Sequence, residues 1–408
     1  MRTLVVMAAA AVLAGCSAGQ GSDTRSRRPP DAGAVESGVD ASPDGSVDPA
    51  TWAARDLIAA RLSRFLWNQA TPDAAIVSAV GAAVSARDVG EVARRMLADP
   101  RARDGTAAFF TWWLRLRDLA TQPKADPAGV FTAEVRAALQ REAPAFGTSV
   151  ILDGDGRYET LMTAPYTFMN ETIAAHYGVT GVSGSELRQV SFGTPDRVGL
   201  LGEAGVLARF AADAVVSWPP RRFWLVKQTL LCTIGLDSSV PINTSGFVIA
   251  ASPALRAQIE TITAPAMCRP CHAAVNPLGD AFIQFDSLGQ RATGSFAGPY
   301  DDASGTLPAG AGGYFTADFS FTGQPDFMRQ IAARPEARDC FAWIALNFAV
   351  NRPSSPEVNT LSIGLRSSLD TLAPPFEASG DIRALLVAIV ETPGFLQATA
   401  PVSAVVSP

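Results

Sequence analysis

The chain has very little histidine, with only His176 and His272 among its 408 residues. Two histidines are too few for a three-histidine metal site or for a multi-haem array built on histidine pairs. Positive charge is also in deficit, because 33 lysines and arginines face 39 aspartates and glutamates, which leaves a formal net charge of −6. Domains that bind nucleic acid usually present a basic face, so the composition argues against a nucleic-acid partner.

A hydrophobic run long enough to cross a bilayer is missing near the N-terminus, where the apolar residues 4–13 are too few. This run follows a positively charged start and ends in Leu-Ala-Gly-Cys, at Cys16. Small residues just before a cysteine resemble the lipobox of a bacterial lipoprotein signal. We therefore predict that residues 1–15 are a signal peptide and that Cys16 becomes the lipidated first residue of an exported protein. The alternative is an ordinary secretory signal that contains a cysteine, which also leads out of the cytoplasm.

The predicted anchor and the segment after it indicate where the protein works. Several acyl chains on one cysteine hold a protein stably in a membrane, so the membrane is an expected partner. Ser17 follows the cysteine, and resemblance to lipoprotein sorting then favours the outer membrane, with the protein facing the periplasm or the exterior. Residues 16–50 are rich in Gly, Ser, Pro and Asp and almost free of large apolar side chains, which predicts a flexible linker.

The body of the chain shows helical periodicity without alternation of strands and helices, so we predict a mainly α, bundle-like fold. Helices are expected over residues 55–68, 131–146 and 161–177, among others. Residues 316–323 alternate enough to predict one short strand or hairpin. Three domains are expected after the linker: a helical domain at 51–190, a haem-attachment domain at 191–300 and a C-terminal helical domain at 301–408.

The densest chemical motif is Cys268-Arg269-Pro270-Cys271-His272, which has the C-x-x-C-H form of a c-type haem attachment site. Thiols three positions apart lie about one helical turn apart and can add to the two vinyl groups on one edge of the porphyrin. The histidine that follows is held beneath the ring, where its imidazole can ligate iron. We therefore predict one covalent haem c, bound through Cys268 and Cys271, with His272 as the proximal ligand.

Three other interpretations of this motif stay open. A redox-active C-x-x-C pair would need βαβ surroundings, of which the sequence shows little. A zinc site needs about four N or S ligands, and the third and fourth would have to come from Cys232, Cys340 or His176. A structural loop without a cofactor is the third interpretation.

The sixth ligand of the iron is left open by the sequence. A histidine would keep the reduction potential lower, and a methionine would raise it. His176 is the only other histidine, and Met328 lies 56 residues after His272, a separation compatible with a distal methionine. An open or water-ligated iron is the remaining alternative.

The five cysteines divide by role. Cys16 is assigned to lipid and Cys268 and Cys271 to haem, which leaves Cys232 and Cys340. In an oxidising compartment a leftover pair favours a disulfide, with two buried free thiols as the alternative.

Further motifs accompany the cysteines: Arg61-Leu62-Ser63, Phe65-Leu66-Trp67, Tyr166-Thr167-Phe168-Met169-Asn170, His176-Tyr177-Gly178, Arg197-Val198-Gly199-Leu200-Leu201, Asn276-Pro277-Leu278-Gly279 and Phe285-Asp286-Ser287-Leu288-Gly289-Gln290-Arg291. With them the sequence resembles the planctomycete-type cytochrome c-like proteins of unknown function, in which linked uncharacterised domains surround a C-x-x-C-H. The resemblance covers most of residues 55–395 and implies a family without a known reaction. The N-terminal haem module of longer members is replaced here by the linker, so a single haem is expected.

Three positions depart from the pattern of that family. Asn276 and Gln284 stand where acidic residues are usual, and Arg222 stands at a usual glycine position. These changes put the family's electrostatic setting near the motif in doubt. Asp286 and Arg291, close after the motif, are expected to hold their loop or to contact a haem propionate.

Taken together, these features predict an exported, lipid-anchored protein with one haem c that transfers single electrons at the cell envelope to a redox partner the sequence does not identify. A haem-dependent envelope enzyme, such as a peroxidase or oxidase component, is the first alternative. It would need an open distal site and a polar group near the iron. A non-redox envelope binding or scaffold protein is the second.

Overall fold

The computed structural model describes residues 48–126, 128–211, 219–232, 255–266, 268–292, 302–309, 315, 317–351 and 363–399. The predicted signal peptide, the predicted lipidation site Cys16 and all but the last three residues of the predicted linker lie outside these ranges. The expected domain boundaries near residues 190 and 300 stay predictions.

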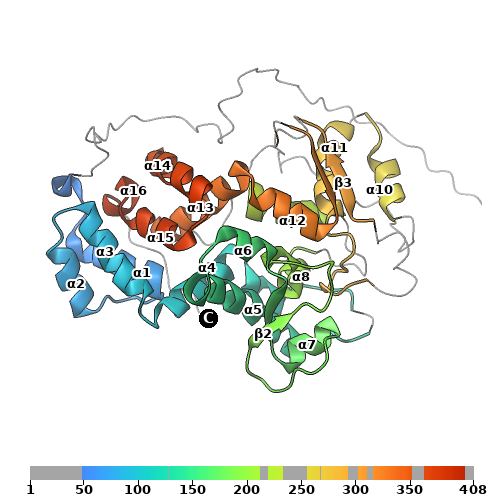
Figure 1. Ribbon diagram of the computed structural model, residues 1–408, viewed down its shortest axis with the longest axis horizontal. Coiled ribbons are helices and arrows are strands. Elements are labelled where there is room, and N and C mark those ends of the chain that lie inside the picture. Colours follow the sequence, from blue (N-terminus) through green and yellow to red (C-terminus); the bar gives the residue numbers. More distant parts are fainter. Residues whose placement is uncertain are drawn as a thin grey trace, which may run out of the picture. The chain divides into compact units, whose positions relative to one another are not determined.

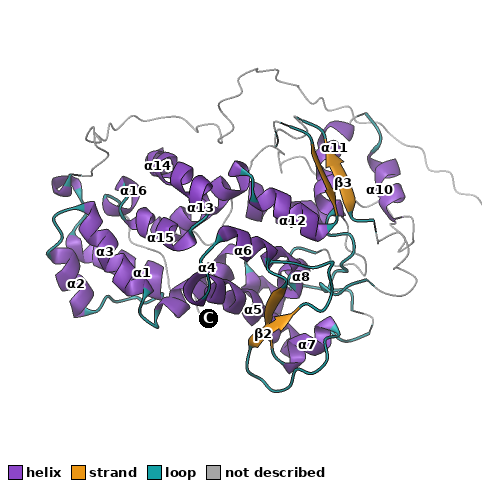
Figure 2. Ribbon diagram, viewed as in Figure 1, coloured by secondary structure: helices purple, strands orange, loops and turns teal. Residues whose placement is uncertain are grey.

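Helices dominate the described residues, as Figure 2 shows, so the prediction of a mainly α fold is confirmed. The α-helices, labelled in Figure 1 where there is room, are α1 (Arg55–Trp67), α2 (Ala74–Gly81), α3 (Ala86–Leu97), α4 (Ala102–Trp113), α5 (Ala133–Thr148), α6 (Tyr158–Thr163), α7 (Glu171–Tyr177), α8 (Ala204–Arg209), α9 (Pro219–Val226), α10 (Leu255–Thr263), α11 (Arg269–Asp280), α12 (Gln324–Ala332), α13 (Pro335–Val350), α14 (Ile363–Ser379), α15 (Ile382–Val390) and α16 (Pro393–Leu396). Shorter turns are the 3-10 helices η1 (Pro49–Thr51), η2 (Leu116–Ala120) and η4 (Leu200–Gly202) and the π-helices η3 (Ser149–Asp153) and η5 (Lys227–Leu231). Within the described residues, none of the helices combines the length and the apolar character that a membrane crossing requires.

Two small antiparallel sheets interrupt the helices. Strand β1 (Tyr166–Met169) pairs with β2 (Arg188–Ser191), and β3 (Ser304–Leu307) pairs with β4 (Phe319–Thr322). The strand expected within residues 316–323 is therefore confirmed as β4.

The prediction of one helix over residues 161–177 is wrong, because β1 separates α6 from α7. Pro165 directly precedes the strand, and the residue before a proline is pushed away from helical geometry. The tetrapeptide Tyr-Thr-Phe-Met then alternates half-buried and buried side chains, which suits a strand. The next helix starts anew at Asn170, whose side-chain oxygen accepts a hydrogen bond from the backbone N–H of Ile173.

The main hydrophobic core joins helices that are far apart in the sequence, from Ile58 in α1 to Leu396 in α16. Its aromatic centre lies between α4 and α13, where the Phe109 and Phe348 rings are 5.3 Å apart and the Trp113 and Phe341 rings are also 5.3 Å apart. Edge-on and tilted ring pairs of this kind stabilise a core beyond the area that they bury. A second, smaller core gathers around α5 and α7 and includes Leu288, which follows the C-x-x-C-H motif in sequence.

A buried arginine ties the first helix to the last described turns of the chain. Arg61 in α1 is fully buried, and its guanidinium donates hydrogen bonds of 2.6 Å each to the carbonyl oxygens of Phe395 and Ala398. Burial lowers the pKa of this arginine to about 10, which leaves it charged at neutral pH. The side chain therefore provides hydrogen bonds to carbonyl oxygens at the end of α16 that the helix itself leaves without a partner.

The disulfide predicted between Cys232 and Cys340 is confirmed. Cys232 directly follows η5, and Cys340 lies in α13, with a Cα–Cα distance of 5.2 Å. This bond connects the segment that precedes the C-x-x-C-H motif to the C-terminal helices.

Candidate functional site

The C-x-x-C-H motif lies at the beginning of α11. Cys268 occupies the N-cap, and Cys271 and His272 fall in the first turn, where Pro270 favours a helix start. The backbone N–H of Cys268 donates to the carbonyl of Pro265 at 2.8 Å, and that of His272 donates to the carbonyl of Cys268 at 3.0 Å. The helical spacing assumed for the two thiols is thus present in the backbone.

Two of the three side chains that define the motif, those of Cys268 and His272, belong to the described part of the chain. Cys268 is a half-buried free thiol. Only the backbone of Cys271 is described, and it places this cysteine one turn further along α11. His272 is half-buried, and its Nδ1 lies 2.9 Å from the Oδ1 of Asn276, one turn further on.

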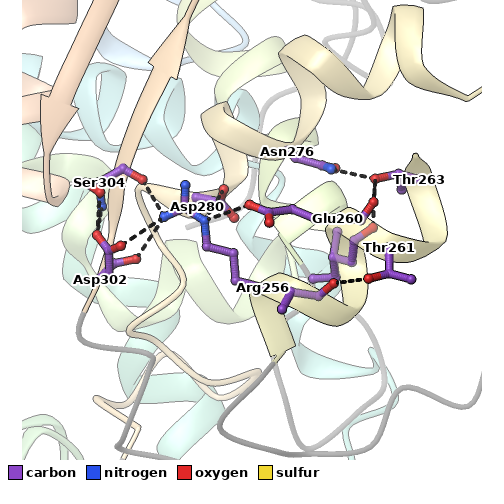
Figure 3. A network of polar contacts seen from close by, with 10 residues as sticks. Arg256, Glu260, Thr261, Thr263, Asn276, Asp280, Asp302 and Ser304 are labelled. Carbon is purple, nitrogen blue, oxygen red and sulfur yellow. Dashed lines mark hydrogen bonds and ion pairs between the residues drawn. The ribbon is translucent and has the colours of Figure 1, made fainter.

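Asn276 continues this contact to the neighbouring helix. Its Nδ2 donates to the hydroxyl oxygen of Thr263, the last residue of α10, at 2.8 Å. The hydroxyl of Thr263 in turn donates to the carbonyl oxygen of Ile259 at 2.7 Å. Figure 3 shows the Asn276–Thr263 bond between the two helices.

A second polar contact fixes α10 against the other end of α11. The guanidinium of Arg256 in α10 approaches the Asp280 carboxylate to 3.6 Å and donates to the carbonyl oxygen of Ser304 in β3 at 2.8 Å (Figure 3). Asp280 is buried, and the loss of solvation raises the pKa of its carboxyl to about 7 against the opposing charge of Arg256. His272, Asn276 and Asp280 are spaced by four residues each, so one side of α11 carries the imidazole and both contacts to α10.

The two candidate distal ligands lie in different parts of the described chain. His176 is buried in α7, where its Nε2 donates to the carbonyl oxygen of Leu288 at 2.9 Å. The side-chain amide of Gln290 lies 3.5 Å from its Nδ1, and burial lowers the pKa of the ring. Met328 is fully buried in α12, within the main hydrophobic core. The distal ligand stays a prediction.

The loop after α11 is held by the residues expected to do so. The Asp286 carboxylate accepts hydrogen bonds from the backbone N–H groups of Leu288 and Gln290 at 2.9 and 2.8 Å. Arg291 forms an ion pair of 2.5 Å with Asp196. Arg222, fully buried in α9, donates to the carbonyl oxygens of Leu207 and Asp286 and so fastens this loop to the helix that packs against α11.

A cluster of buried ionisable groups was not predicted from the sequence. The Tyr177 hydroxyl donates to the Glu142 carboxylate at 2.5 Å, Thr167 donates to Glu203 at 2.8 Å, and the Arg197 guanidinium lies 4.7 Å from the Tyr177 ring centre. Burial raises the pKa of Glu142 to about 7 and that of Glu203 well above its ordinary value. Glu142 did leave a signal in the sequence, because an acidic residue stands on an otherwise apolar helical face between Leu139 and Phe146.

The donor set of α11 fits a covalent haem c. It supplies a free thiol, a second cysteine one turn later and an imidazole whose Nδ1 is already hydrogen-bonded, which leaves Nε2 for a metal. The zinc interpretation loses two of its three remaining candidate ligands, because Cys232 and Cys340 are bonded to each other. A thioredoxin-like setting is not found in the described residues, where all named strands pair antiparallel.

The fold and this site define a mostly helical protein with a cytochrome-like domain built around C-x-x-C-H. Residues 55–179 match the family model PSD4, "Protein of unknown function (DUF1592)", and residues 197–294 match PSCyt3, "Protein of unknown function (DUF1588)". Together the two matches cover more than half of the chain, which therefore belongs to the multi-domain proteins of unknown function that carry these planctomycete cytochrome-like domains. No curated protein and no solved structure matches the chain significantly.

The two matched regions meet in the buried ionisable cluster. Glu142 and Tyr177 belong to the first match, whereas Arg197 and Glu203 belong to the second. The C-x-x-C-H motif lies wholly within the second match. The cluster therefore holds the motif-bearing region to the preceding helices.

Proposed function

We propose that the protein is an exported, lipid-anchored c-type cytochrome that carries one haem and transfers single electrons at the cell envelope. The observation that carries this proposal is the C-x-x-C-H at the start of α11, with both cysteines on one helical turn and the imidazole hydrogen-bonded through Nδ1. The lipobox at Cys16 supports export, which covalent haem attachment requires in bacteria.

The residues of the chain have separate tasks in this proposal. Cys268 and Cys271 would hold the haem covalently: each S–H would add across one vinyl group of the porphyrin, forming one C–S and one C–H bond without an oxidant. His272 would offer Nε2 as the proximal ligand, and Met328 or His176 would be the distal ligand unless the iron stays open or binds water. The bound haem supplies one-electron iron chemistry, and the surrounding chain sets its potential through burial and axial ligation.

The membrane part of the proposal is independent of the haem part. Cys16 would carry the lipid, and the segment at residues 16–50 would give the folded body reach from the outer membrane toward its redox partner. A Cys16→Ser variant should leave the membrane fraction while keeping any attached haem. Retention of that variant in the membrane would contradict anchoring at this cysteine.

Mass spectrometry of the peptide that contains residues 268–272 tests the haem directly. Protein produced with the haem-attachment machinery should carry the mass of one haem there, and protein produced without the machinery should not. Cys268→Ala and Cys271→Ala should impair attachment, whereas Arg269→Lys, an exposed position between the thiols, should not. A folded, colourless protein from competent cells would overturn the proposal.

Absorption spectra of the loaded protein separate electron transfer from catalysis. A six-coordinate, low-spin reduced form supports electron transfer, and a high-spin ferric form that binds cyanide or peroxide supports a haem-dependent enzyme instead. Spectra of Met328→Leu and His176→Gln identify the sixth ligand, because only loss of the true ligand changes the spin state. A colourless but folded protein would leave an envelope binding or scaffold protein as the function.

A further inference from the structure

The hydrogen bonds between α10 and α11 have a direction that determines which ring nitrogen of His272 donates to Asn276. The carbonyl oxygen of Ile259 can only accept, so the hydroxyl proton of Thr263 is used in that 2.7 Å bond. The Thr263 oxygen then accepts from Asn276, which places the amide nitrogen of Asn276 toward Thr263 and its oxygen toward His272. An amide oxygen cannot donate, so the proton between the two groups belongs to the Nδ1 of His272.

We propose that Asn276, oriented by Thr263, is a positioning residue that holds the neutral ring of His272 in the Nδ1–H tautomer and presents the lone pair of Nε2. This inference rests on the proposed haem function for its purpose but not for its geometry. A ligating imidazole commonly donates its other N–H to a fixed acceptor, and the nature of that acceptor tunes the basicity of the ligand. Here the acceptor is a neutral amide, which leaves the imidazole less electron-rich than a carboxylate would.

The hydrogen bonds that run from His272 through Asn276 to Thr263 form a relay. Burial makes this relay stronger than a surface contact. Thr263 is 7% exposed and Asn276 is 8% exposed, so water competes poorly for their hydrogen bonds. A buried amide whose partner is removed must lose a hydrogen bond or turn toward another one. The orientation of Asn276 therefore depends on the single hydroxyl of Thr263.

The position of α10 does not depend on that hydroxyl alone. Arg256, two turns earlier in α10, contacts Asp280 of α11 and Ser304 of β3. A variant that removes only the Thr263 hydroxyl should consequently leave both helices in place. Its effect then reports on the orientation of Asn276 and His272.

The tautomers can be read by nitrogen NMR of the full chain prepared without haem, at a pH well above the ordinary imidazole pKa of about 6.5. The chain has only two histidines, and His176 must carry its proton on Nε2 because that atom donates to the carbonyl of Leu288. The wild-type spectrum should therefore show one Nε2–H ring and one Nδ1–H ring. The first ring serves as an internal reference.

Thr263→Val and Asn276→Leu should raise the ratio of the Nε2–H to the Nδ1–H form of His272 about fivefold, the change produced by one ordinary net hydrogen bond. Thr261→Val is the matched control, because Thr261 lies in the same helix and donates at 2.7 Å to the carbonyl of Ala257 instead. The ratio should not change in this control. An unchanged ratio in Thr263→Val and Asn276→Leu would overturn the inference.

The haem-loaded protein gives an independent reading. Asn276→Asp should lower the midpoint potential relative to wild type, because a carboxylate acceptor makes the imidazole a stronger donor to iron. Should circular dichroism show the haem-free chain to be unfolded, the Nδ1 proton can be followed in the reduced loaded protein, where Thr263→Val must speed its exchange with solvent. An unchanged potential and exchange rate would refute the relay.

These outcomes keep the two proposals apart. A wild-type protein that never acquires haem refutes the proposed function, whereas the tautomer ratios still test the relay. A protein that acquires haem but shows no response to Thr263→Val or Asn276→Asp refutes the relay alone.

Discussion

Two buried carboxyl groups lie where the two matched regions meet, and their burial governs their pKa values. Glu142 and Glu203 are fully buried, and the second oxygen of Glu203 has no hydrogen-bond partner within the described residues. Arg197 opposes their loss of solvation, but burial is the larger effect on the pKa of both carboxyls. Each group is consequently easier to keep protonated in the folded protein than in the unfolded chain.

This arrangement predicts that stability falls as the pH rises. The folded-state pKa of Glu142, about 7, exceeds its unfolded value of about 4.5, so the native state binds more protons between these limits. The free energy of unfolding should be highest below about pH 4.5 for this group and should decrease up to about pH 7, by roughly 3 kcal/mol. Urea denaturation across this range measures the slope.

Glu203→Gln tests the second buried carboxyl, whose raised pKa adds to that slope. The amide keeps the acceptor for Thr167 and removes the charge, so the variant should be more stable than wild type above neutral pH and should depend less on pH. Glu134→Gln, which changes an exposed carboxylate of α5, is the control and should leave the slope unchanged. A wild-type stability that rises between pH 5 and pH 7 would contradict the explanation.

At the residue scale, the sequence identified reactive residue types better than the side-chain contacts that those residues make. The C-x-x-C-H motif and the Cys232–Cys340 pair follow from residue types and the count of cysteines. The Asn276–Thr263 contact could not be predicted, because it depends on how α10 lies against α11 across 13 residues of sequence.

At the scale of secondary-structure elements, glycine is what permits helices to approach one another closely. Gly105 in α4 faces the backbone of α1, where an added Cβ would overlap the carbonyl of Leu66. Gly147 in α5 leaves room in the same way for the ring of Phe110 in α4. Helices α1, α4 and α5 are thus packed so closely that a methyl group in place of either glycine hydrogen would not fit.

Gly105→Ala should therefore destabilise the protein although alanine favours a helix. The overlap with the backbone of α1 forces a shift that costs about 1–3 kcal/mol, which exceeds the helix preference of up to about 1 kcal/mol. Gly81→Ala is the control, because nothing lies within 4 Å of a Cβ at that position, the last residue of α2. Thermal unfolding of both variants measures the difference, and equal stability of the two would count against this packing.

Helical periodicity predicted the helices well where the sequence itself marks their beginning and end. Residues 55–68 form α1 almost to the residue, and 131–146 form α5, which begins at the cap Thr132. Residues 161–177 were misread because the apolar spacing continued across Pro165, and a strand paired with β2 accounts for the spacing instead. The partner strand, residues 188–191, is mostly exposed and gives no strong pattern of its own.

The disulfide is the covalent link that acts at the scale of the whole molecule. It joins residues 108 positions apart, and closing a loop of about 100 residues is worth about 4–5 kcal/mol in the chain-entropy model. Replacing Cys232 and Cys340 together by Ala should reduce the free energy of unfolding by about this amount. Cys268→Ala, which removes a thiol outside the disulfide, should have a much smaller effect in the haem-free chain. Equal losses in denaturant titrations of the two variants would refute a special role for the cross-link.

Composition and periodicity were sufficient for the class of the whole molecule, since both indicate a mainly helical body. They were insufficient for its assembly. The main core takes side chains from helices at both ends of the described chain, and Arg61 reaches carbonyl oxygens more than 330 residues away. Contacts over such separations depend on the packed arrangement and leave no local pattern in the sequence.

The Cys232–Cys340 bond also determines which fragments can separate after proteolysis. It closes residues 232–340 into a covalent ring, and Cys268, Cys271 and His272 lie on the contour of that ring. A protease that cuts the ring once converts it into two arms that remain joined through sulfur, so no fragment carrying the motif is released. Release of a piece that carries Cys268, Cys271 and His272 would take a second cut within the ring or a reductant, so the cross-link protects this segment against loss by a single cleavage.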